Sequence, residues 1–375
     1  MTTKPIKLTA ALLCLVLFMA FSGEISGQSD TLDIKEPNDT SEAKKNFIAA
    51  YPIAFYLPET RLAFGGACIY TYFPGKEKSS NPSLWQMGGA YTLNKQILLY
   101  VSYQLFLRQN RTEIFGEIGY FDYVFPYFGT GNATIYDQEE NYYANFPRIY
   151  FNYLERVKGN FRAGGVIKFD LFNIKETLED GILESSQVTG IEGGVVTNAG
   201  LLMRYDSRDI VFLPNKGLFA TLEVTRSGKL VGSEYPYTEV FLNASAYFSL
   251  KKNHVLATNL VTGAQVGEVP FYKLLTMGGP KRPRGIIEGR YRDKSLLLLQ
   301  MEYRFPIYKR FAGVAFASTG RVAEQYKDLA SAGFHYNVGG GLRFVLDKNN
   351  KLRLRLDVGF GSDKPAFYFT VGEAF

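Results

Sequence analysis

Histidine, cysteine and tryptophan are scarce in this chain of 375 residues, which contains two His, two Cys and one Trp. The sequence has no Cys/His cluster, no HExxH motif and no GxSxG motif, so it carries no signature of the common metal centres or hydrolase sites. Long apolar runs are also scarce, because only the N-terminal end approaches the run of about 20 apolar residues that a transmembrane helix needs. A bundle of transmembrane helices is therefore excluded, in agreement with a mean hydropathy of -0.09.

Aromatic residues and glycine are abundant instead, with 30 Phe, 26 Tyr and 37 Gly. Disordered chains are poor in aromatic residues, so this composition indicates a folded protein. The formal charge of +6 at pH 7 is modest, and most charged residues alternate with apolar ones rather than forming a block. Nucleic acid is therefore not an expected partner.

The first 46 residues differ from the rest of the chain. Residues 1–27 contain two early Lys, then an apolar stretch and then small residues, which predicts a secretory signal peptide. Residues 28–46 are polar and aperiodic, which predicts a flexible periplasmic leader. Without the signal peptide, Cys68 is the only cysteine, so no intrachain disulfide is expected in the folded part, residues 47–375.

From residue 47 onward the dominant hydrophobic period is two. In the segment KLRLRLDVGF, residues 351–360, the apolar side chains share one face and the charged side chains share the other. A helix would scatter these charges around its circumference, so the pattern predicts a strand with one apolar and one charged face. The same alternation recurs at 99–107, 161–171 and 297–305.

Two architectures produce such strands: a soluble sandwich with its apolar faces inward, and a transmembrane barrel with its apolar faces toward lipid. The periodic segments exceed the roughly 5 to 6 residues of typical soluble strands, and short polar turns alternate with long loops, so the barrel is favoured. Aromatic residues at the strand ends would then form girdles at the level of the lipid headgroups.

We therefore predict an all-β fold, a transmembrane antiparallel β-barrel of sixteen strands that closes between the first and the last strand. The predicted strands are 47–56, 62–73, 84–93, 97–109, 113–127, 142–156, 161–173, 194–206, 217–227, 236–250, 254–267, 294–306, 310–321, 334–346, 351–360 and 366–375.

Two motifs of the C-terminal half lie at strand ends. The chain ends in FYFTVGEAF, an alternating segment with four apolar residues on one face of the predicted last strand. These residues are Phe367, Phe369, Val371 and Phe375. The second motif, YDSRDIVFLPNKG, precedes the predicted ninth strand. Its distinctive residues are Asp206, Arg208, Asp209, Pro214 and Gly217.

A third motif lies in the long loop between the predicted eleventh and twelfth strands. This segment is MGGPKRPRGIIEGRYRDKSLLLLQMEYRFP, and it contains the dipeptide Arg284-Gly285. The predicted strand that follows the loop ends in EYRFP, which begins at Glu302. Together the three motifs resemble those of BamA/TamA-type outer-membrane barrels, the bacterial surface antigen superfamily. The resemblance covers the C-terminal half of the chain, since the first half contributes only the rhythm of its strands.

The resemblance implies specific roles for these residues. The loop would fold back into the lumen, where Arg284 would pair with Glu302, and a guanidinium suits such a pairing because its fork matches a carboxylate. A second acid of the family, in a Phe-x-Asp-x-Gly pattern, is replaced here by Ser318, which would weaken the attachment of the loop to the barrel wall. The C-terminal aromatic pattern would be the signal that the barrel-assembly machinery reads. The residues alone leave open a solvated basic loop that binds anionic lipopolysaccharide.

By the same resemblance, the chain would be an integral protein of the bacterial outer membrane without POTRA domains, because residues 28–46 are too few for one. It would act in protein insertion, assembly or translocation through a lateral seam between the first and last strands. Its partners would be outer-membrane lipid, lipopolysaccharide, the assembly machinery during its own insertion, and a separate periplasmic or surface protein.

Two alternatives remain open. The first is a structural or passive-pore barrel that keeps the loop for stability alone. The second, least favoured, is an outer-membrane hydrolase, because neither His254 nor His335 has a convincing Ser partner. We expect a protein that is not an enzyme and has no catalytic, cofactor-binding or metal-binding residues.

Overall fold

The computed structural model describes residues 46–57, 61–74, 81–211, 213–347, 352–361 and 364–375. The predicted signal peptide and nearly all of the predicted leader lie outside these residues. The described chain is dominated by one antiparallel sheet of sixteen strands, each paired with its neighbour along the chain. The sheet strands are β1 (Phe47–Leu57), β2 (Arg61–Tyr72), β3 (Ser83–Thr92), β4 (Ile97–Leu107), β5 (Thr112–Tyr127), β6 (Glu140–Lys158), β7 (Phe161–Glu176), β8 (Gly193–Asp206), β9 (Gly217–Ser227), β10 (Tyr237–Lys251), β11 (His254–Gly267), β14 (Ser295–Tyr308), β15 (Phe311–Ala323), β16 (His335–Asp347), β17 (Leu352–Phe360) and β18 (Ala366–Val371).

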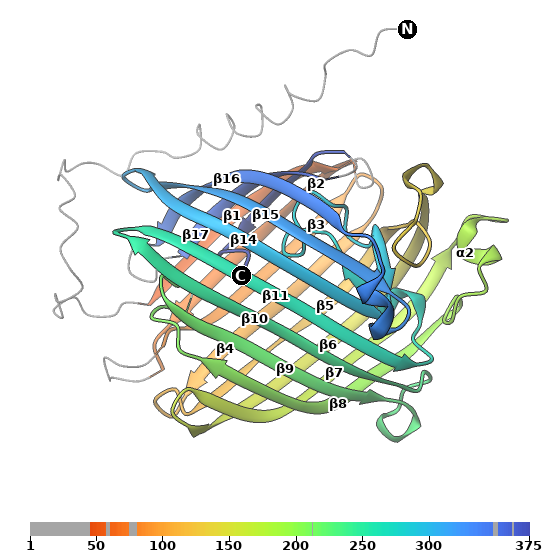
Figure 1. Ribbon diagram of the computed structural model, residues 1–375, viewed down its shortest axis with the longest axis horizontal. Helices are drawn as coiled ribbons and strands as arrows, with labels where there is room; N and C mark the ends of the chain where they lie inside the picture. The colour runs from red at the N-terminus through yellow and green to blue at the C-terminus, as the bar shows by residue number, and fades with distance from the viewer. Residues whose placement is uncertain (1–45, 58–60, 75–80, 212, 348–351, 362–363) are drawn as a thin grey trace, which may run out of the picture.

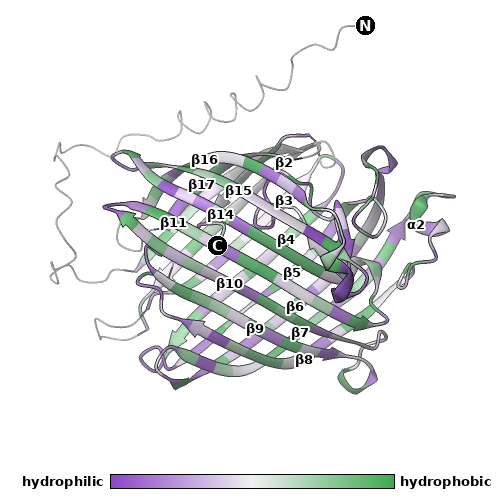
Figure 2. Cartoon of the chain, viewed as in Figure 1, coloured by the Kyte–Doolittle hydropathy of each residue, from purple (hydrophilic) through white to green (hydrophobic). Residues whose placement is uncertain are grey.

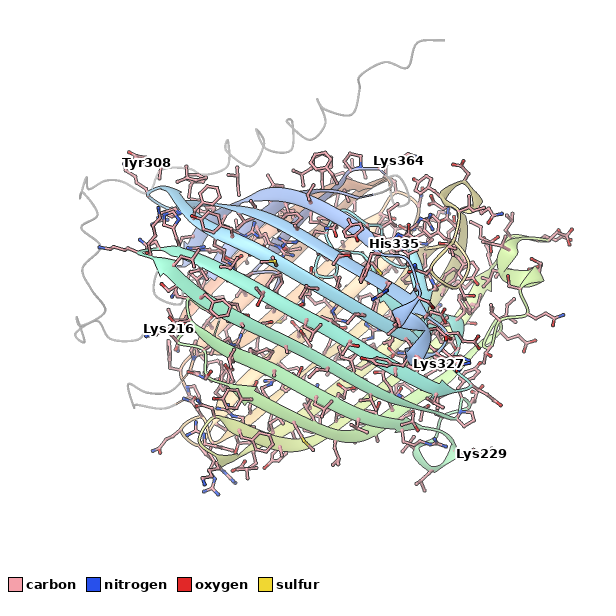
Figure 3. The ribbon with its side chains drawn as sticks, in the orientation of Figure 1. Lys216, Lys229, Tyr308, Lys327, His335 and Lys364 are labelled. Atoms are coloured by element: carbon pink, nitrogen blue, oxygen red, sulfur yellow. The ribbon has the colours of Figure 1, made fainter. Side chains whose placement is uncertain are left out.

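The tilted strands curl into a barrel with two distinct ends (Figure 1). At one end lie short connections such as 159–160 and 252–253, and we call this the short-turn end. Long connections, including 177–192 and 268–294, lie at the other end, which we call the loop end. In Figure 3 the labelled Lys216 and Tyr308 mark the short-turn end, whereas Lys229, Lys327, His335 and Lys364 mark the loop end.

The two faces of the sheet differ as the period of two predicts. Outward-facing apolar side chains are exposed over the whole wall, for example Leu201 at 61% and Ile167 at 53%. A soluble protein rarely exposes a contiguous apolar surface of this extent, whereas lipid would cover it. Inward-facing side chains include many buried polar and charged groups, such as Asp170, Gln300 and Arg343. In Figure 2 apolar and hydrophilic residues alternate along the strands, and hydrophilic residues are frequent at the connections.

Sequence periodicity located the sixteen strands correctly, with one substantial error at the end of the chain. The last strand was predicted to run to residue 375, but β18 ends at Val371. The reason is Gly372, whose φ of +85° turns the chain out of the extended conformation. Within the described residues no ladder joins β18 to β1, so closure between these two strands stays a prediction.

The loop of residues 268–294, which joins β11 to β14, has structure of its own. It contains a 3-10 turn, η3 (Phe271–Lys273), and a small two-stranded ribbon of β12 (Leu275–Met277) and β13 (Tyr291–Asp293). We call this segment the lumen loop. The ribbon packs against the inner face of β11, β14 and β15 through one buried apolar cluster. Its members are Val261, Leu275, Met277, Ile286, Tyr291, Leu296, Leu298 and Val322.

The first part of the lumen loop reaches a different part of the wall. Phe271 packs into an aromatic cluster on the inner face of β5, β6 and β7. In this cluster the ring of Tyr272 stacks on Phe172, with 4.1 Å between ring centroids. The loop therefore lies in the lumen, as the resemblance implied, and it contacts two separate parts of the wall.

Among the described helices, none is long and apolar enough to cross a membrane.

Candidate functional site: a loop docked in the barrel lumen

Arg284, at the tip of the lumen loop, is 1% exposed and binds two carboxylates on different strands. Its Nη2 atom lies 2.7 Å from Oε2 of Glu302 on β14. Its Nη1 atom donates to Oδ2 of Asp357 on β17 over 2.7 Å. The two branches of one guanidinium thus connect the loop to two strands that are not neighbours in the sheet, a geometry that a lysine ammonium does not offer. The predicted pairing of Arg284 with Glu302 is present.

The ring of Phe316 on β15 completes the pocket around Arg284. The guanidinium carbon lies 3.7 Å from the ring centroid, so the planar cation stacks on the aromatic face. β15 lies between β14 and β16 in the sheet, so the stacking residue comes from the wall between the two acids. The three contacts fix the guanidinium in one orientation.

The sequence predicted a weaker attachment of Arg284, because position 318 has no acid. The structure shows that Arg284 nevertheless contacts two carboxylates. Asp357, two strands further along the sheet, provides the second one. Ser318 has a different position in the network, because its Oγ donates to Oδ1 of Asn337 over 2.6 Å. Asn337 in turn donates from Nδ2 to the main-chain oxygen of Arg284. Ser318 therefore supports the main chain of the loop rather than the guanidinium.

Gly285 allows the loop to lie directly against the barrel wall. Its φ of +106° is a conformation that residues with a side chain rarely adopt. A Cβ atom there would lie 2.7 Å from the main-chain carbon of Gly359 on β17 and 2.7 Å from the main-chain nitrogen of Phe360. Its own N–H donates to the hydroxyl of Tyr368 on β18 over 3.0 Å. The dipeptide Arg284-Gly285 thus connects β14 to β18 across the inside of the wall.

Other arginines share the two acids. Arg304 donates from Nε to Glu302 over 2.7 Å, and Arg343 donates to both Asp357 and Glu302. Glu302 and Asp357 are 0% exposed at the side chain, so the surrounding guanidinium groups replace the water that the charges would otherwise need. The region is a connected ionic network rather than an isolated ion pair.

A second anchor holds the other end of the lumen loop, and sequence reasoning did not identify it. Lys273 in η3 donates to Oδ2 of Asp170 on β7. Asp170, 0% exposed at the side chain, also accepts from Arg148 Nε and the Tyr150 hydroxyl, each over 2.7 Å. Burial lowers the pKa of Lys273, and the Asp170 carboxylate works against that lowering. The loop is therefore fixed at both walls by buried ion pairs.

Replacing Lys273 with Met should loosen the first half of the lumen loop and cost about 1–3 kcal/mol, since Asp170 would lose one of its charged partners. The measurement is the temperature at which the barrel loses its heat-modifiable migration on gels. A matched control is Lys175→Met, because Lys175 forms a more exposed pair with Asp122 and should lose less than about 1 kcal/mol. Equal midpoints for the two variants would show that the Lys273 contact does not anchor the loop.

The motif before the ninth strand forms the connection between β8 and β9 at the short-turn end. Arg208 binds both oxygens of Asp206 and stacks on the ring of Phe219. Asp209 accepts main-chain N–H groups from Ile210, Asn215 and Lys216. Pro214 is buried, and Gly217 has a φ of +112° where the strand begins. The motif therefore shapes a turn, and it lies far along the chain from the lumen loop.

The C-terminal motif divides into two parts. Phe367 and Phe369 face outward from β18 and are 62% and 52% exposed, as predicted. Phe375 was predicted to share their face, and this was wrong. After the turn at Gly372 it packs against Tyr247, Val255 and Ala257, whose side chains face the lumen. Val371 ends the strand opposite Leu354.

Within the described part of the chain, no group of three or more His, Cys, Asp and Glu side chains is arranged to hold a metal ion. The two histidines lie at strand starts, as predicted. His254 contacts the Tyr303 hydroxyl, and His335 stacks on Tyr291.

Sixteen antiparallel strands, an apolar outer face, and a loop docked inside a charged lumen define a β-barrel of the outer-membrane type. Residues 196–375 match the family model described as the Omp85 superfamily domain. The C-terminal half of the chain is therefore similar to the Omp85 superfamily domain, and the resemblance to BamA-type barrels is confirmed.

Solved structures of two kinds of protein share this fold. One is BamA from Haemophilus ducreyi lacking POTRA domains 1–3, with 14% identity, a TM-score of 0.54, and coverage of 88% of this chain and 69% of that one. A second is CdiB from Acinetobacter baumannii, with 13% identity, a TM-score of 0.51, and coverage of 87% of this chain and 59% of that one. A third is CdiB from Escherichia coli, with 13% identity, a TM-score of 0.58, and coverage of 87% of this chain and 62% of that one. The chain thus spans about three fifths of either CdiB chain. A comparison with curated proteins gave no match.

Proposed function

We propose that this protein resides in the bacterial outer membrane and acts in the insertion or translocation of proteins through a lateral seam between β1 and β18. The Omp85 superfamily domain of residues 196–375 supports this proposal. The proposal includes no enzymatic activity. Outer-membrane lipid and lipopolysaccharide would surround the barrel, and a separate periplasmic or surface protein would work with it.

The observation that carries the proposal is the weakness of the sheet at its two ends. β18 has only 6 residues, whereas β5 and β6, which lie away from the ends of the sheet, have 16 and 19 residues. β1 contains Pro52, which has no N–H to donate to a neighbouring strand and is typical of an edge. If β1 and β18 pair, a short strand beside a strand with a missing donor would separate at low cost.

The lumen loop would brace the wall beside this seam. Because Arg284 and Gly285 contact β14, β17 and β18, the last strands would move together with the loop when the seam opens. The competing function of a passive pore is less well supported, because the aromatic cluster around Phe271 and Tyr272 lies inside the barrel.

The proposal predicts that locking the seam abolishes activity. In a Cys68→Ala background, Ala50→Cys on β1 would be combined with Phe367→Cys or Phe369→Cys on β18. After oxidation, the variant that forms the cross-link should insert a client barrel into liposomes at least about tenfold more slowly, equivalent to about 1.4 kcal/mol in the barrier. Reduction should restore the rate.

The chain offers a matched control for this test. Ala50 lies opposite Cys68 in the β1–β2 ladder, and antiparallel partners lie within the distance range of a disulfide. Ala50→Cys with the native Cys68 therefore places a cross-link beside the seam but not across it, and the insertion rate should not change. If the oxidised seam variant is as active as this control, the lateral-seam proposal fails.

A further inference from the structure

The last four residues, 372–375, form a segment that we call the C-terminal tail. The tail leaves the sheet at Gly372, whose N–H donates to the main-chain oxygen of Arg353 over 2.8 Å. The chain then turns inward, and in Figure 1 the C-terminus lies within the outline of the barrel. Two of its side chains, Glu373 and Phe375, contact inward-facing residues of other strands.

Glu373 enters a cluster of arginines on the inner wall. Its side chain is 4% exposed, and its Oε2 atom accepts from Arg343 Nε over 2.7 Å. Its Oε1 atom lies 3.4 Å from Arg353 Nη1. A carboxylate so deeply buried is stable only when cations take the place of water around it. The contacts come from β16 and β17, so Glu373 ties the tail to the wall from inside.

Phe375 fills the adjacent apolar part of the site. Its ring packs with Tyr247 of β10 and with Val255 and Ala257 of β11. Its main-chain oxygen accepts from Arg304 Nη2 over 2.8 Å. The site thus recognises three features of a peptide: a carboxylate, a main-chain oxygen two residues later, and the aromatic ring of that later residue.

The arginines of this region outnumber its acids. The arginines are Arg284, Arg304, Arg343, Arg353 and Arg355, and the acids are Glu302, Asp357 and Glu373. Within the described residues, Nη1 of Arg304 and Nε of Arg353 are buried without a hydrogen-bond partner. Removal of Glu373 would leave these five guanidinium groups with two carboxylate side chains, so the site would attract another carboxylate.

We propose that part of the inner wall is a binding site for a peptide of the pattern acid-x-aromatic. This site consists of Arg304, Arg343 and Arg353 together with the apolar residues Tyr247, Val255 and Ala257. In the described state the C-terminal tail of the chain occupies it. The tail is a tethered ligand, and a second peptide of the same pattern binds when the tail is released. The proposal is independent of the lateral seam, because it needs only the contacts of the tail.

Release of the tail can be measured by thiol accessibility. Ala374 is 7% exposed, so a cysteine introduced by Ala374→Cys in the Cys68→Ala chain should react slowly with a charged maleimide. Adding Glu373→Gln should raise the labelling rate at least about tenfold, because the neutral amide does not balance Arg343 and Arg353. Glu324→Gln is the control, since the Glu324 side chain is 72% exposed in an outer loop and its neutralisation should leave the rate unchanged.

Binding of a second peptide is tested with a fluorescent peptide of residues 370–375, TVGEAF. The full chain carrying Glu373→Gln and Phe375→Ala should bind this peptide at least about tenfold more tightly than a peptide with Gln in place of its Glu. The parent chain should bind neither, because its tethered tail competes at a high effective concentration.

Three outcomes would overturn the proposal. They are fast labelling of Ala374→Cys in the chain that keeps Glu373, equal affinities for the Glu and Gln peptides, and absence of binding to the variant chain. Heat-modifiable migration checks that each variant is folded. If Glu373→Gln alone prevents folding, Phe375→Ala takes its place in the labelling experiment, with the same expected increase.

Discussion

Arg284→Ala is expected to lower the stability of the barrel by about 3–5 kcal/mol, the cost of removing one partner from a buried ion pair. The substitution leaves Glu302 and Asp357 buried with one cation fewer and removes the cation that stacks on Phe316. Arg284→Lys should recover only part of the loss, because a single ammonium does not reach two carboxylates in the way a guanidinium fork does. The measurement is the midpoint of the heat-modifiable gel shift.

The matched control for this prediction is Arg111→Ala. Arg111 also pairs with a glutamate, Glu155, over 2.8 Å, but its side chain is 68% exposed. Exposed pairs contribute less than about 1 kcal/mol, so the control should unfold close to the parent. If Arg284→Ala and Arg111→Ala shift the midpoint equally, the lumenal pair is not a structural lock.

Gly285→Ala is the second substitution with a large expected effect. The backbone conformation at φ +106° costs about 1–3 kcal/mol for a residue with a side chain. The added Cβ would also lie 2.7 Å from main-chain atoms of Gly359 and Phe360, which do not move aside like a flexible side chain. This second effect should add about 1–3 kcal/mol. We expect the lumen loop to move away from β17, with faster proteolysis of residues 278–290.

Gly232→Ala separates the two contributions. Gly232 has a φ of +75°, and nothing lies within 4 Å of the position of an added Cβ. This control therefore carries the conformational cost without the contact. Gly285→Ala should be the less stable variant, and equal stability of the two would mean that the loop does not press against the wall.

Much of the fold could be predicted from the sequence because a barrel wall imposes a strict alternation. The segment KLRLRLDVGF shows why: Leu356 faces outward and Asp357 faces the lumen, as its pattern predicted. The pairing of Arg284 with Glu302 could also be predicted, from the resemblance of the loop motif.

Contacts across the lumen could not be predicted in the same way. Alternation placed Asp170 and Asp357 on the inner face, but it does not say which inner residues meet the loop. The sequence has Ser318 on β15 where the resemblance places a second acid, and it gave no sign that Asp357 on β17 takes that role. The pairing of Lys273 with Asp170 joins residues 103 positions apart in the chain, and nothing in their local sequence marks it.

The C-terminal tail was mispredicted because the alternation continues through it. Phe375 has the same parity as Phe367 and Phe369, so a period of two places all three on one face. Only the conformation of Gly372 turns the chain inward, and glycine is also common inside strands of this sequence. The buried position of Glu373 needs the arginines of β16 and β17, which only the folded barrel brings together.

The central claim is that the lumen loop ties β14 to β17 through the guanidinium of Arg284. A double-mutant cycle with Arg284→Ala, Asp357→Asn and the combined variant tests it most directly, with the free energy of unfolding as the measured quantity. If the two side chains act as one contact, the combined loss will fall short of the sum of the single losses by at least about 1 kcal/mol. Losses that add within about 0.5 kcal/mol would contradict the claim.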